Sequence, residues 1–251
     1  MLIIFIFAYF DVNVDSHRGM LMASVEMTAE KPYYNPTLSM AKKNGSCAKL
    51  ALDLGCGKNP YFFRGHFNNY IGIDLDIDTL EKISRDLPGS SLIYASGSYA
   101  PFISGIFNVV ICTEVLEHLE NPEKMIGEIS RVLAKGGKAV VSIPSLSLPQ
   151  TLLLWIGYKI KRISEKPYQS PDHVREYSRF KVTPHFEKTS ELFKLFRQKQ
   201  LEIRGFVTVQ SLYTNPKILY SVFLSKTERL FEKLLSKHLF GHHTIFEAEK
   251  K

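Results

Sequence analysis

The feature that most constrains the fold is a regular alternation of short apolar strands and helices between residues 49 and 143. Five segments rich in Val, Ile and Leu have the length of strands: Lys49–Leu54, Tyr70–Leu75, Ser91–Ala95, Phe107–Thr113 and Lys138–Ile143. Strands that are apolar throughout are typical of a parallel sheet covered on both faces. Because crossovers between parallel strands are right-handed, the pattern predicts a doubly wound α/β sheet.

Helix signals fill the connections between these strands. Asn59-Pro60 is typical of a helix N-terminus, with Asn as the cap and Pro at the first helical position. Residues 78–86 form a second helical stretch. Asn121 opens the clearest helix, and we expect Gly136-Gly137 to end it. Its apolar residues recur at helical spacing, at Met125, Ile126, Ile129, Val132 and Leu133.

The second half of the chain has a different character. Residues 148–163 and 217–240 are apolar and carry interspersed or flanking lysines. Such segments pack in a core, line a hydrophobic substrate site or lie on a membrane surface. We also expect a helix over 189–199, a strand over 201–210 and a last strand over 243–250.

The N-terminus bears on the domain boundaries. Leu2–Phe10 is apolar but too short to span a bilayer, and it has no preceding Lys or Arg. Further methionines follow, at Met20, Met22 and Met27. We therefore predict that residues 1–26 are dispensable and that 27–251 form one domain, with hydrophobic cap insertions around 146–187 and 214–240.

Charge and cysteine usage narrow the function classes. The net charge is +7, and the positive charge gathers in the apolar segments rather than around the glycine turn after the first strand. This distribution favours a lipid-like substrate or peripheral membrane contact over nucleic acid. The three cysteines (Cys47, Cys56 and Cys112) have no C-x-x-C spacing, so we expect a reducing, cytoplasmic location and no metal site.

The candidate ligand site follows from the order of the strands. In open parallel α/β sheets, ligands bind outside the carboxyl ends of the strands. Four polar or glycine-rich groups come directly after predicted strands: Asp53 to Gly57, Asp74, Ser96 to Ser98, and Thr113-Glu114. Glycine lets the backbone turn sharply, and a carboxylate twenty residues later suits a ribose diol.

Two cofactors share this arrangement, and charge distinguishes them. A dinucleotide requires G-x-G-x-x-G, but the third glycine would fall on Pro60. Asp53 beside the turn is unfavourable next to a pyrophosphate and favourable next to S-adenosylmethionine, which carries an ammonium and a sulfonium. The residues therefore favour S-adenosylmethionine over NAD.

The same motifs resemble those of class I S-adenosylmethionine-dependent methyltransferases, and of the type 11 subgroup in particular. The resemblance rests on A-L-D-L-G-C-G (51–57), on Ile71–Asp74 and on F-N-V-V-I-C-T-E-V-L-E-H (107–118). It is firm over about residues 48–145 and loose to Phe206. It implies a Rossmann-like, mostly parallel, seven-stranded sheet with helical cap insertions.

The resemblance also implies roles for individual residues. Residues expected to contact the cofactor are Asp53, Gly55, Cys56, Gly57, Asp74, Leu75, Ser96, Gly97, Thr113 and Glu114. Asp53 and the two glycines would line its methionine part, and Asp74 would hold the ribose. Cys56 is interpreted as a small buried spacer rather than a nucleophile. The family usually has an acid after the third strand, where this chain has Ser96.

The catalytic candidates are fewer. His118, His173 and Tyr177 would serve as a general base if the acceptor starts protonated. Glu117 and His118 precede a helix, which favours capping and packing over catalysis for both, and the segment of His173 and Tyr177 suits a substrate lid and a solvated loop equally. The predicted function is methyl transfer to a small, hydrophobic or lipid-like acceptor. The alternatives are a non-catalytic binding or membrane-docking module of the same fold, and an NAD-binding oxidoreductase.

Overall fold

The computed structural model describes residues 37, 39–41, 50–146, 173–178, 186–209 and 243–251, which all belong to one compact unit, residues 32–251. Its strands are β1 (Ala51–Leu54), β2 (Tyr70–Asp74), β3 (Ser91–Tyr94), β4 (Phe107–Thr113), β5 (Leu133–Leu146), β6 (Glu176–Ser178), β7 (Phe186–Lys188), β8 (Leu201–Val209) and β9 (His243–Lys250). Its α-helices are α3 (Pro60–Phe63), α4 (Ile77–Asp86), α5 (Pro122–Val132) and α7 (Thr189–Gln198). Short 3-10 helices are η2 (Arg64–His66), η3 (Gly97–Tyr99) and η4 (Leu116–His118).

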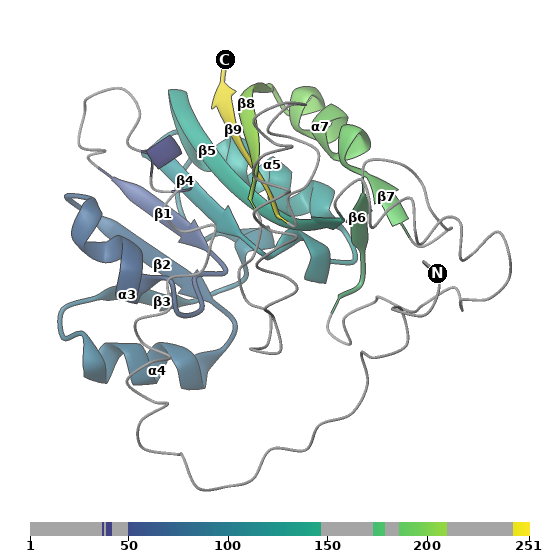
Figure 1. The fold of residues 1–251 in the computed structure, drawn as a ribbon. Helices are drawn as coiled ribbons and strands as arrows, with labels where there is room; N and C mark the ends of the chain where they lie inside the picture. The colour runs from purple at the N-terminus through teal and green to yellow at the C-terminus, as the bar shows by residue number, and fades with distance from the viewer. Residues whose placement is uncertain (1–36, 38, 42–49, 147–172, 179–185, 210–242) are drawn as a thin grey trace, which may run out of the picture. The chain divides into compact units, whose positions relative to one another are not determined.

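The predicted doubly wound sheet is confirmed (Figure 1). Its main strand order is β3-β2-β1-β4-β5-β9-β8, seven strands as expected. The first five strands are parallel, and β9 runs antiparallel to both β5 and β8. The short strands β6 and β7 were not predicted; they extend the sheet from Ser145 and Leu146 at the end of β5.

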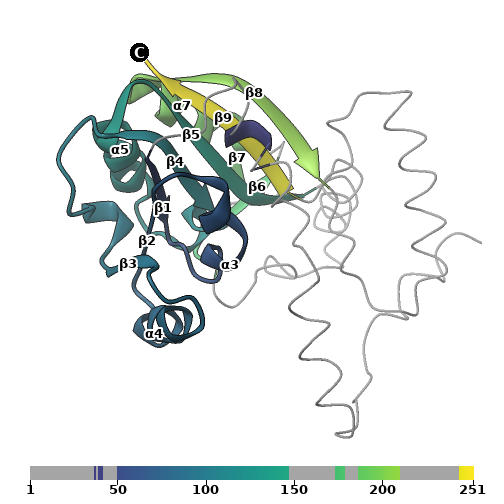
Figure 2. The same ribbon diagram turned by 90° about the vertical axis from the view of Figure 1, so that its left-hand side faces the viewer.

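Two apolar layers cover the faces of the sheet (Figure 2). On one face α5 and α7 pack against alternate residues of the strands, among them Leu52, Val110 and Phe246. On the other face Phe63 of α3 joins Ala51, Ile111 and further strand residues. Successive side chains of a strand point to opposite faces, so Asp53 lies on the α3 side with Ala51.

Two predicted boundaries are wrong: α5 ends at Val132, before Gly136-Gly137, and β5 runs from Leu133 to Leu146 and not from Lys138 to Ile143. Leu133 already pairs with Phe107 of β4, and the register then shifts so that Val109 pairs with Lys138. Gly136 has a φ of 72°, within this irregular part of β5. The two glycines therefore serve a strand irregularity and not a helix C-cap.

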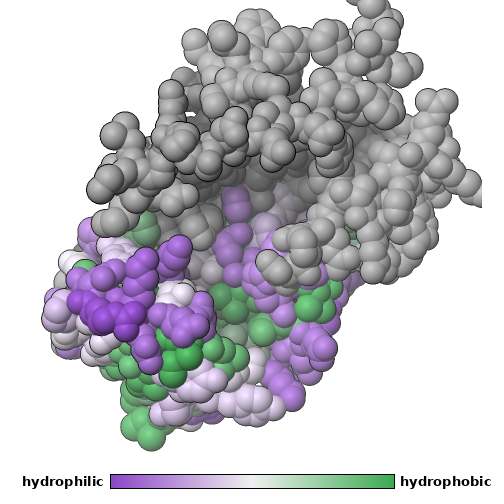
Figure 3. Space-filling model, turned by 90° about the horizontal axis from the view of Figure 1, so that it is seen from below, coloured by the Kyte–Doolittle hydropathy of each residue, from purple (hydrophilic) through white to green (hydrophobic). Residues whose placement is uncertain are grey.

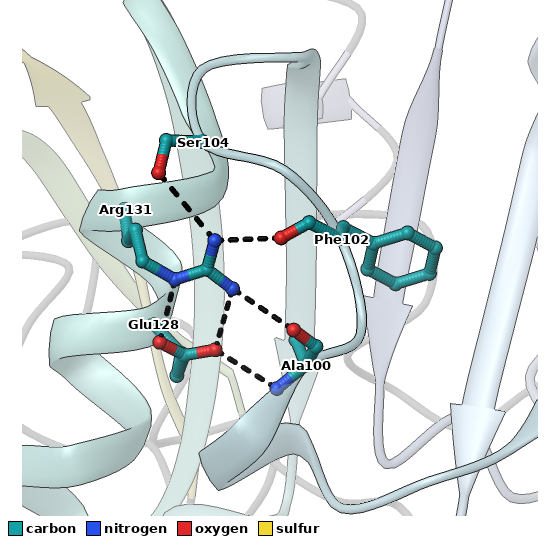
Figure 4. Close-up of polar contacts among 5 residues, drawn as sticks. All are labelled: Ala100, Phe102, Ser104, Glu128 and Arg131. Atoms are coloured by element: carbon teal, nitrogen blue, oxygen red, sulfur yellow. Dashed lines mark hydrogen bonds and ion pairs between the residues drawn. The ribbon is translucent and has the colours of Figure 1, made fainter.

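Polar contacts fix the connection after β3 onto α5 (Figure 4). Arg131 of α5 donates to the carbonyl oxygens of Phe102 (2.6 Å) and Ala100 (2.9 Å) and to both carboxylate oxygens of Glu128. Glu128 also accepts from the backbone N–H of Ala100. This connection carries η3, so the contacts hold one of the predicted cofactor segments in place.

Other predictions lie outside the described residues. These are the dispensable segment 1–26 and most of the two cap insertions, 146–187 and 214–240. In the described part of the chain, no helix has both the length and the apolar character that crossing a membrane requires.

Candidate functional site

The turn after β1 is a tight glycine loop next to β2. Gly55 and Gly57 have φ values of 70° and 43°, a region that side chains rarely adopt. The N–H groups of Gly55 and Cys56 both donate to the carbonyl oxygen of Ile73. A Cβ atom on Gly55 would stand 2.6 Å from Cγ2 of Val115, so this position requires glycine for both its backbone angle and its space.

Asp74, at the end of β2, holds that loop. Its Oδ2 accepts from the N–H of Gly57 at 2.7 Å, and its Oδ1 accepts from the N–H of Asp76 at 2.9 Å. The residue is half-buried. Each carboxylate oxygen has a second lone pair, so Asp74 can accept further hydrogen bonds from a ligand at the edge of the sheet.

Asp53 is placed differently from the sequence-based expectation of cofactor contact. Its side chain is fully buried and accepts hydrogen bonds from the hydroxyl of Tyr70 at 2.5 Å and from Nδ2 of Asn59 at 3.1 and 3.3 Å. Burial raises the pKa of Asp53 to about 7, although these hydrogen bonds oppose the shift. Asp53 therefore lies beneath the glycine loop and supports it, with no exposed atom for direct ligand contact.

Asn59 takes the N-cap position of α3 as predicted, but its side chain does not cap the helix, which corrects the sequence-based interpretation. Its backbone is helical, at φ −57° and ψ −33°, and its side chain makes no cap hydrogen bond. Instead Nδ2 donates to Asp53 and, at 2.8 Å, to Oγ1 of Thr113. Pro60 still begins the helix as expected, but Asn59 connects the ends of β1 and β4.

Cys56 is the buried residue that the sequence analysis expected. Burial raises the pKa of its thiol far above its usual range, so the sulfur stays protonated and is a poor nucleophile. A Cβ atom on Gly72 would stand 2.8 Å from Sγ of Cys56, so the thiol packs directly against β2.

The segment after β3 forms a third part of the edge. Ser96 precedes η3, and its Oγ accepts from the N–H of Ser98 at 3.3 Å. Gly97 is buried, and a Cβ atom there would stand 2.6 Å from Cε of Met125.

Leu75, directly after Asp74, has 60% of its surface exposed. An exposed leucine here offers an apolar surface that a flat aromatic base would cover.

Glu114 directly follows β4 and has an unusual backbone conformation, with a φ of 54°. Its Oε1 accepts from the hydroxyl of Ser142 at 2.6 Å, and its Oε2 lies 3.0 Å from Nδ1 of His243. These contacts connect the ends of β4, β5 and β9. Backbone strain of this kind concentrates at functional sites, where neighbouring contacts maintain it.

The three catalytic candidates have different surroundings. The rings of His118 and His173 lie edge to face, with their centroids 4.9 Å apart. Tyr177 is fully buried, and its hydroxyl has no hydrogen-bond partner among the described residues. Burial raises the pKa of this phenol, so it stays protonated at neutral pH. The geometry therefore favours the two histidines over Tyr177 as proton acceptors.

Glu117 lies beside the histidines and was interpreted from sequence as a packing or capping residue. Its side chain is buried, and neither carboxylate oxygen has a hydrogen-bond partner within the described ranges. Burial raises the pKa of Glu117 to about 9, and the charge of Glu114 contributes to the shift.

Four residues contribute to the site without having been assigned there from sequence: Asn59, Tyr70, Ser142 and His243. Asn59 carried a signal, but it was read as a cap. Tyr70 looked like an ordinary strand residue, and the contacts of Ser142 and His243 depend on how β4, β5 and β9 pair.

Comparison with known proteins locates the similarity in the first half of the chain. Residues 52–141 match the methyltransferase-domain family of type 11. An uncharacterized protein of Methanocaldococcus jannaschii is 38% identical over 92 residues, which are 37% of this chain and 43% of that protein. An uncharacterized methyltransferase of Mycobacterium sp. (strain KMS) is 32% identical over 38% of each chain. These matches thus span about two fifths of those relatives.

Proteins that match over more of the chain have a lower sequence identity to it. The ubiquinone biosynthesis O-methyltransferase of Aliivibrio fischeri is 25% identical over 69% of this chain and 71% of its own. Among solved structures, the protein bound to the methyltransferase activator Trm112 in a Haloferax volcanii complex has a TM-score of 0.59 at 14% identity, covering 94% of this chain and 99% of its own. A geranyl diphosphate methyltransferase in complex with S-adenosylmethionine has a TM-score of 0.54 at 13% identity, covering 87% and 84%.

Proposed function

We propose that this chain transfers a methyl group from S-adenosylmethionine to a small, hydrophobic or lipid-like acceptor, because residues 52–141 match a methyltransferase domain. The observation that carries the proposal is the glycine loop at the end of β1, tied by the N–H of Gly57 to the carboxylate of Asp74. This contact supports the proposal because it sets a carboxylate, which would accept from the ribose, beside an open backbone turn at one edge of the sheet.

In this proposal, different residues contact different parts of the cofactor. Gly55 and Gly57 give the methionine part close access to the backbone, and Asp74 accepts from the ribose hydroxyls. Leu75 packs on the adenine, and Ser96 and Gly97 approach the adenine edge in place of an acid. Cys56, Thr113 and Asn59 support the loop from below, and Glu114 closes the site at the end of β4.

Asp53 acts through the loop rather than by contact. It is fully buried beneath the loop, and its carboxylate is held by Tyr70 and Asn59. When ionised it would contribute a negative potential under a cofactor that carries an ammonium and a sulfonium. The same potential opposes a pyrophosphate, and Pro60 takes the place of the third glycine of a dinucleotide site. Both points make an NAD-dependent oxidoreductase the poorer interpretation.

Two observations support an apolar acceptor in this proposal. The ubiquinone biosynthesis O-methyltransferase of Aliivibrio fischeri resembles this chain over more than two thirds of its length, and its name specifies an acceptor of the quinone pathway. On the described surface, hydrophobic residues appear in patches between hydrophilic ones (Figure 3). Among the described residues, exposed apolar side chains besides Leu75 include Ile77, Tyr94, Tyr99 and Ile103. Both favour an apolar acceptor.

The reaction itself requires little covalent chemistry from the protein. A nucleophilic atom of the acceptor attacks the methyl carbon, and the bond from that carbon to the sulfonium sulfur breaks, leaving a neutral thioether. Catalysis then consists mainly of aligning the two reactants and excluding water. For an acceptor hydroxyl, His118 or His173 would take the proton.

The location of the reaction is part of the proposal. The lysine-bearing apolar segments 148–163 and 217–240 suit contact with an anionic membrane surface, where an apolar acceptor would be found. We place the chain in the cytoplasm, peripheral to the membrane, with no nucleic-acid partner. Flotation with vesicles containing or lacking anionic lipid tests this, and equal recovery in both would contradict it.

Methyl transfer is tested with cofactor labelled in the methyl group. We expect labelled product when the purified chain is incubated with a lipid extract, and mass spectrometry would then identify the acceptor. Asp74→Ala should lose this activity, while Asp78→Ala, at an exposed carboxylate of α4, should keep it. Tight cofactor binding without turnover on any extract would instead favour a non-catalytic module. Binding of NAD and not of S-adenosylmethionine would overturn the proposal.

A further inference from the structure

The segment after β4 and the segment before β6 bring three potential metal ligands together. One ligand atom each from Glu117, His118 and His173 lies within 4.8 Å of the others. Glu117 and His118 belong to η4, whereas His173 is 55 residues away in the sequence from His118. Cysteine spacing in the sequence predicted no metal site, and His173 is too far from Glu117 and His118 in the sequence for the three to form a recognisable motif.

The backbone fixes the two segments against each other. The carbonyl oxygen of Glu117 accepts from the N–H groups of both Val174 and Arg175, each at 2.9 Å. The guanidinium of Arg175 donates to the carbonyl oxygens of Leu119 (3.1 Å) and Glu120 (2.6 Å), and it pairs with Glu187. His173 is therefore held beside His118 by contacts that do not involve either imidazole, which leaves the ligand geometry formed in advance.

The carboxylate of Glu117 supplies an independent indication of a ligand. Its side chain is only 1% exposed, and both oxygens lack a hydrogen-bond partner among the residues described. The ion pair that the structure gives it is with Nε2 of His118, at 3.9 Å. Burying a carboxylate without hydrogen bonds is costly, because nothing replaces its water, and a bound cation removes that cost.

The surroundings of His173 match those of a metal-binding histidine. Its Nδ1 lies 3.1 Å from Oε1 of Glu176, a buried residue of β6. Histidines that bind a metal through one ring nitrogen commonly donate the other N–H to a carboxylate, which orients the ring. Glu176 would play that part for His173.

We propose that Glu117, His118 and His173 bind a divalent first-row transition-metal ion such as Zn²⁺. One carboxylate and two imidazoles suit such ions, whereas Mg²⁺ and Ca²⁺ prefer oxygen ligands throughout. Three protein ligands leave a coordination position open. If the proposed methyl transfer is correct, an oxygen of the acceptor can occupy that position. The ligand Glu117 is three residues after Glu114, which belongs to the proposed cofactor site.

Cobalt(II) provides a test that needs neither cofactor nor acceptor. The chain without a histidine tag is treated with chelator and titrated with Co²⁺, whose visible absorption reports on nitrogen and oxygen ligands. We expect one ion per chain and loss of the absorption when Zn²⁺ is added. His173→Ala and His118→Ala should each weaken binding at least 100-fold, and Glu176→Gln about 10- to 100-fold. His66→Ala, at an exposed histidine of η2, should bind as the unmodified chain does.

Thermal unfolding separates ligation from structural effects. Glu117→Gln keeps the shape of the side chain, so we expect the metal-free melting temperature to change little while the rise on adding Zn²⁺ is lost. If Glu117→Gln does not fold, the two histidine variants carry the test. Absence of the cobalt spectrum, or equal binding by the His173→Ala, His118→Ala and His66→Ala variants, overturns the proposal. Binding of S-adenosylmethionine, measured separately, shows whether the methyltransferase assignment stands in either case.

Discussion

Replacing Asp74 by alanine perturbs the glycine loop and the proposed ribose contact together. In the structure its two oxygens accept from the N–H groups of Gly57 (2.7 Å) and Asp76 (2.9 Å), and the proposal adds the ribose hydroxyls. Hydrogen bonds to a charged group contribute about 1.5–3 kcal/mol each when buried and less when half exposed. We therefore expect cofactor affinity to fall by about 1–3 kcal/mol, which is about 5- to 150-fold in Kd.

Isothermal titration calorimetry with S-adenosylmethionine measures this loss directly. Asp74→Asn provides a graded comparison, because the amide keeps one acceptor oxygen but removes the charge, so its Kd should fall between those of the unmodified chain and Asp74→Ala. Asp78→Ala controls for removing a carboxylate from the same region. Unfolding in urea shows whether each variant is folded. A folded Asp74→Ala variant with unchanged Kd would remove Asp74 from the site.

Three further predictions concern the support of the site. Gly55→Ala should destabilise the fold by about 2–5 kcal/mol, from its positive φ and the overlap with Val115, and combining it with Val115→Ala should cost less than the sum of the two in urea unfolding. Because the pKa of Asp53 is raised from 3.8 to about 7, the folded state holds a proton that the unfolded state releases. The unfolding free energy relative to Asp53→Asn should thus fall by up to about 4 kcal/mol from pH 4 to 7, and a flat difference would contradict the burial argument. Arg131→Ala should lower the unfolding free energy by about 2–3 kcal/mol, and Arg131→Lys by nearly as much, because lysine cannot donate to Glu128 and to two carbonyl oxygens at once. As a control, Arg85→Ala, which removes an exposed ion pair, should lower it by less than about 0.5 kcal/mol.

The sequence predicted the parallel half of the fold well, because its strands are continuously apolar and its turns carry Gly and Pro. β4 and β9 have the predicted bounds, and the others up to β3 differ by one or two residues. The end of α5 was missed because Gly136-Gly137 suits both a helix C-cap and a strand irregularity. Only the pairing of Leu133 with Phe107 distinguishes these two.

The site was predicted in part for a related reason. Residues that directly follow a strand, such as Gly55 and Asp74, can be placed from strand order alone. The direction of a side chain cannot be placed in this way. Successive side chains of a strand alternate between the two faces of the sheet, and Asp53 therefore lies beneath the glycine loop, where Tyr70 and Asn59 donate hydrogen bonds to it. Contacts between distant segments also could not be predicted, as with His243 at Glu114 and Val174 at Glu117.

A crystal structure of the chain with bound S-adenosylmethionine shows most directly whether the carboxyl edge of this sheet is the cofactor site. We predict that the nucleoside lies over the Gly55–Gly57 turn, with its ribose hydroxyls on the carboxylate of Asp74 and its adenine against Leu75. A nucleoside bound elsewhere on the protein, or none at saturating concentration, would contradict the assignment.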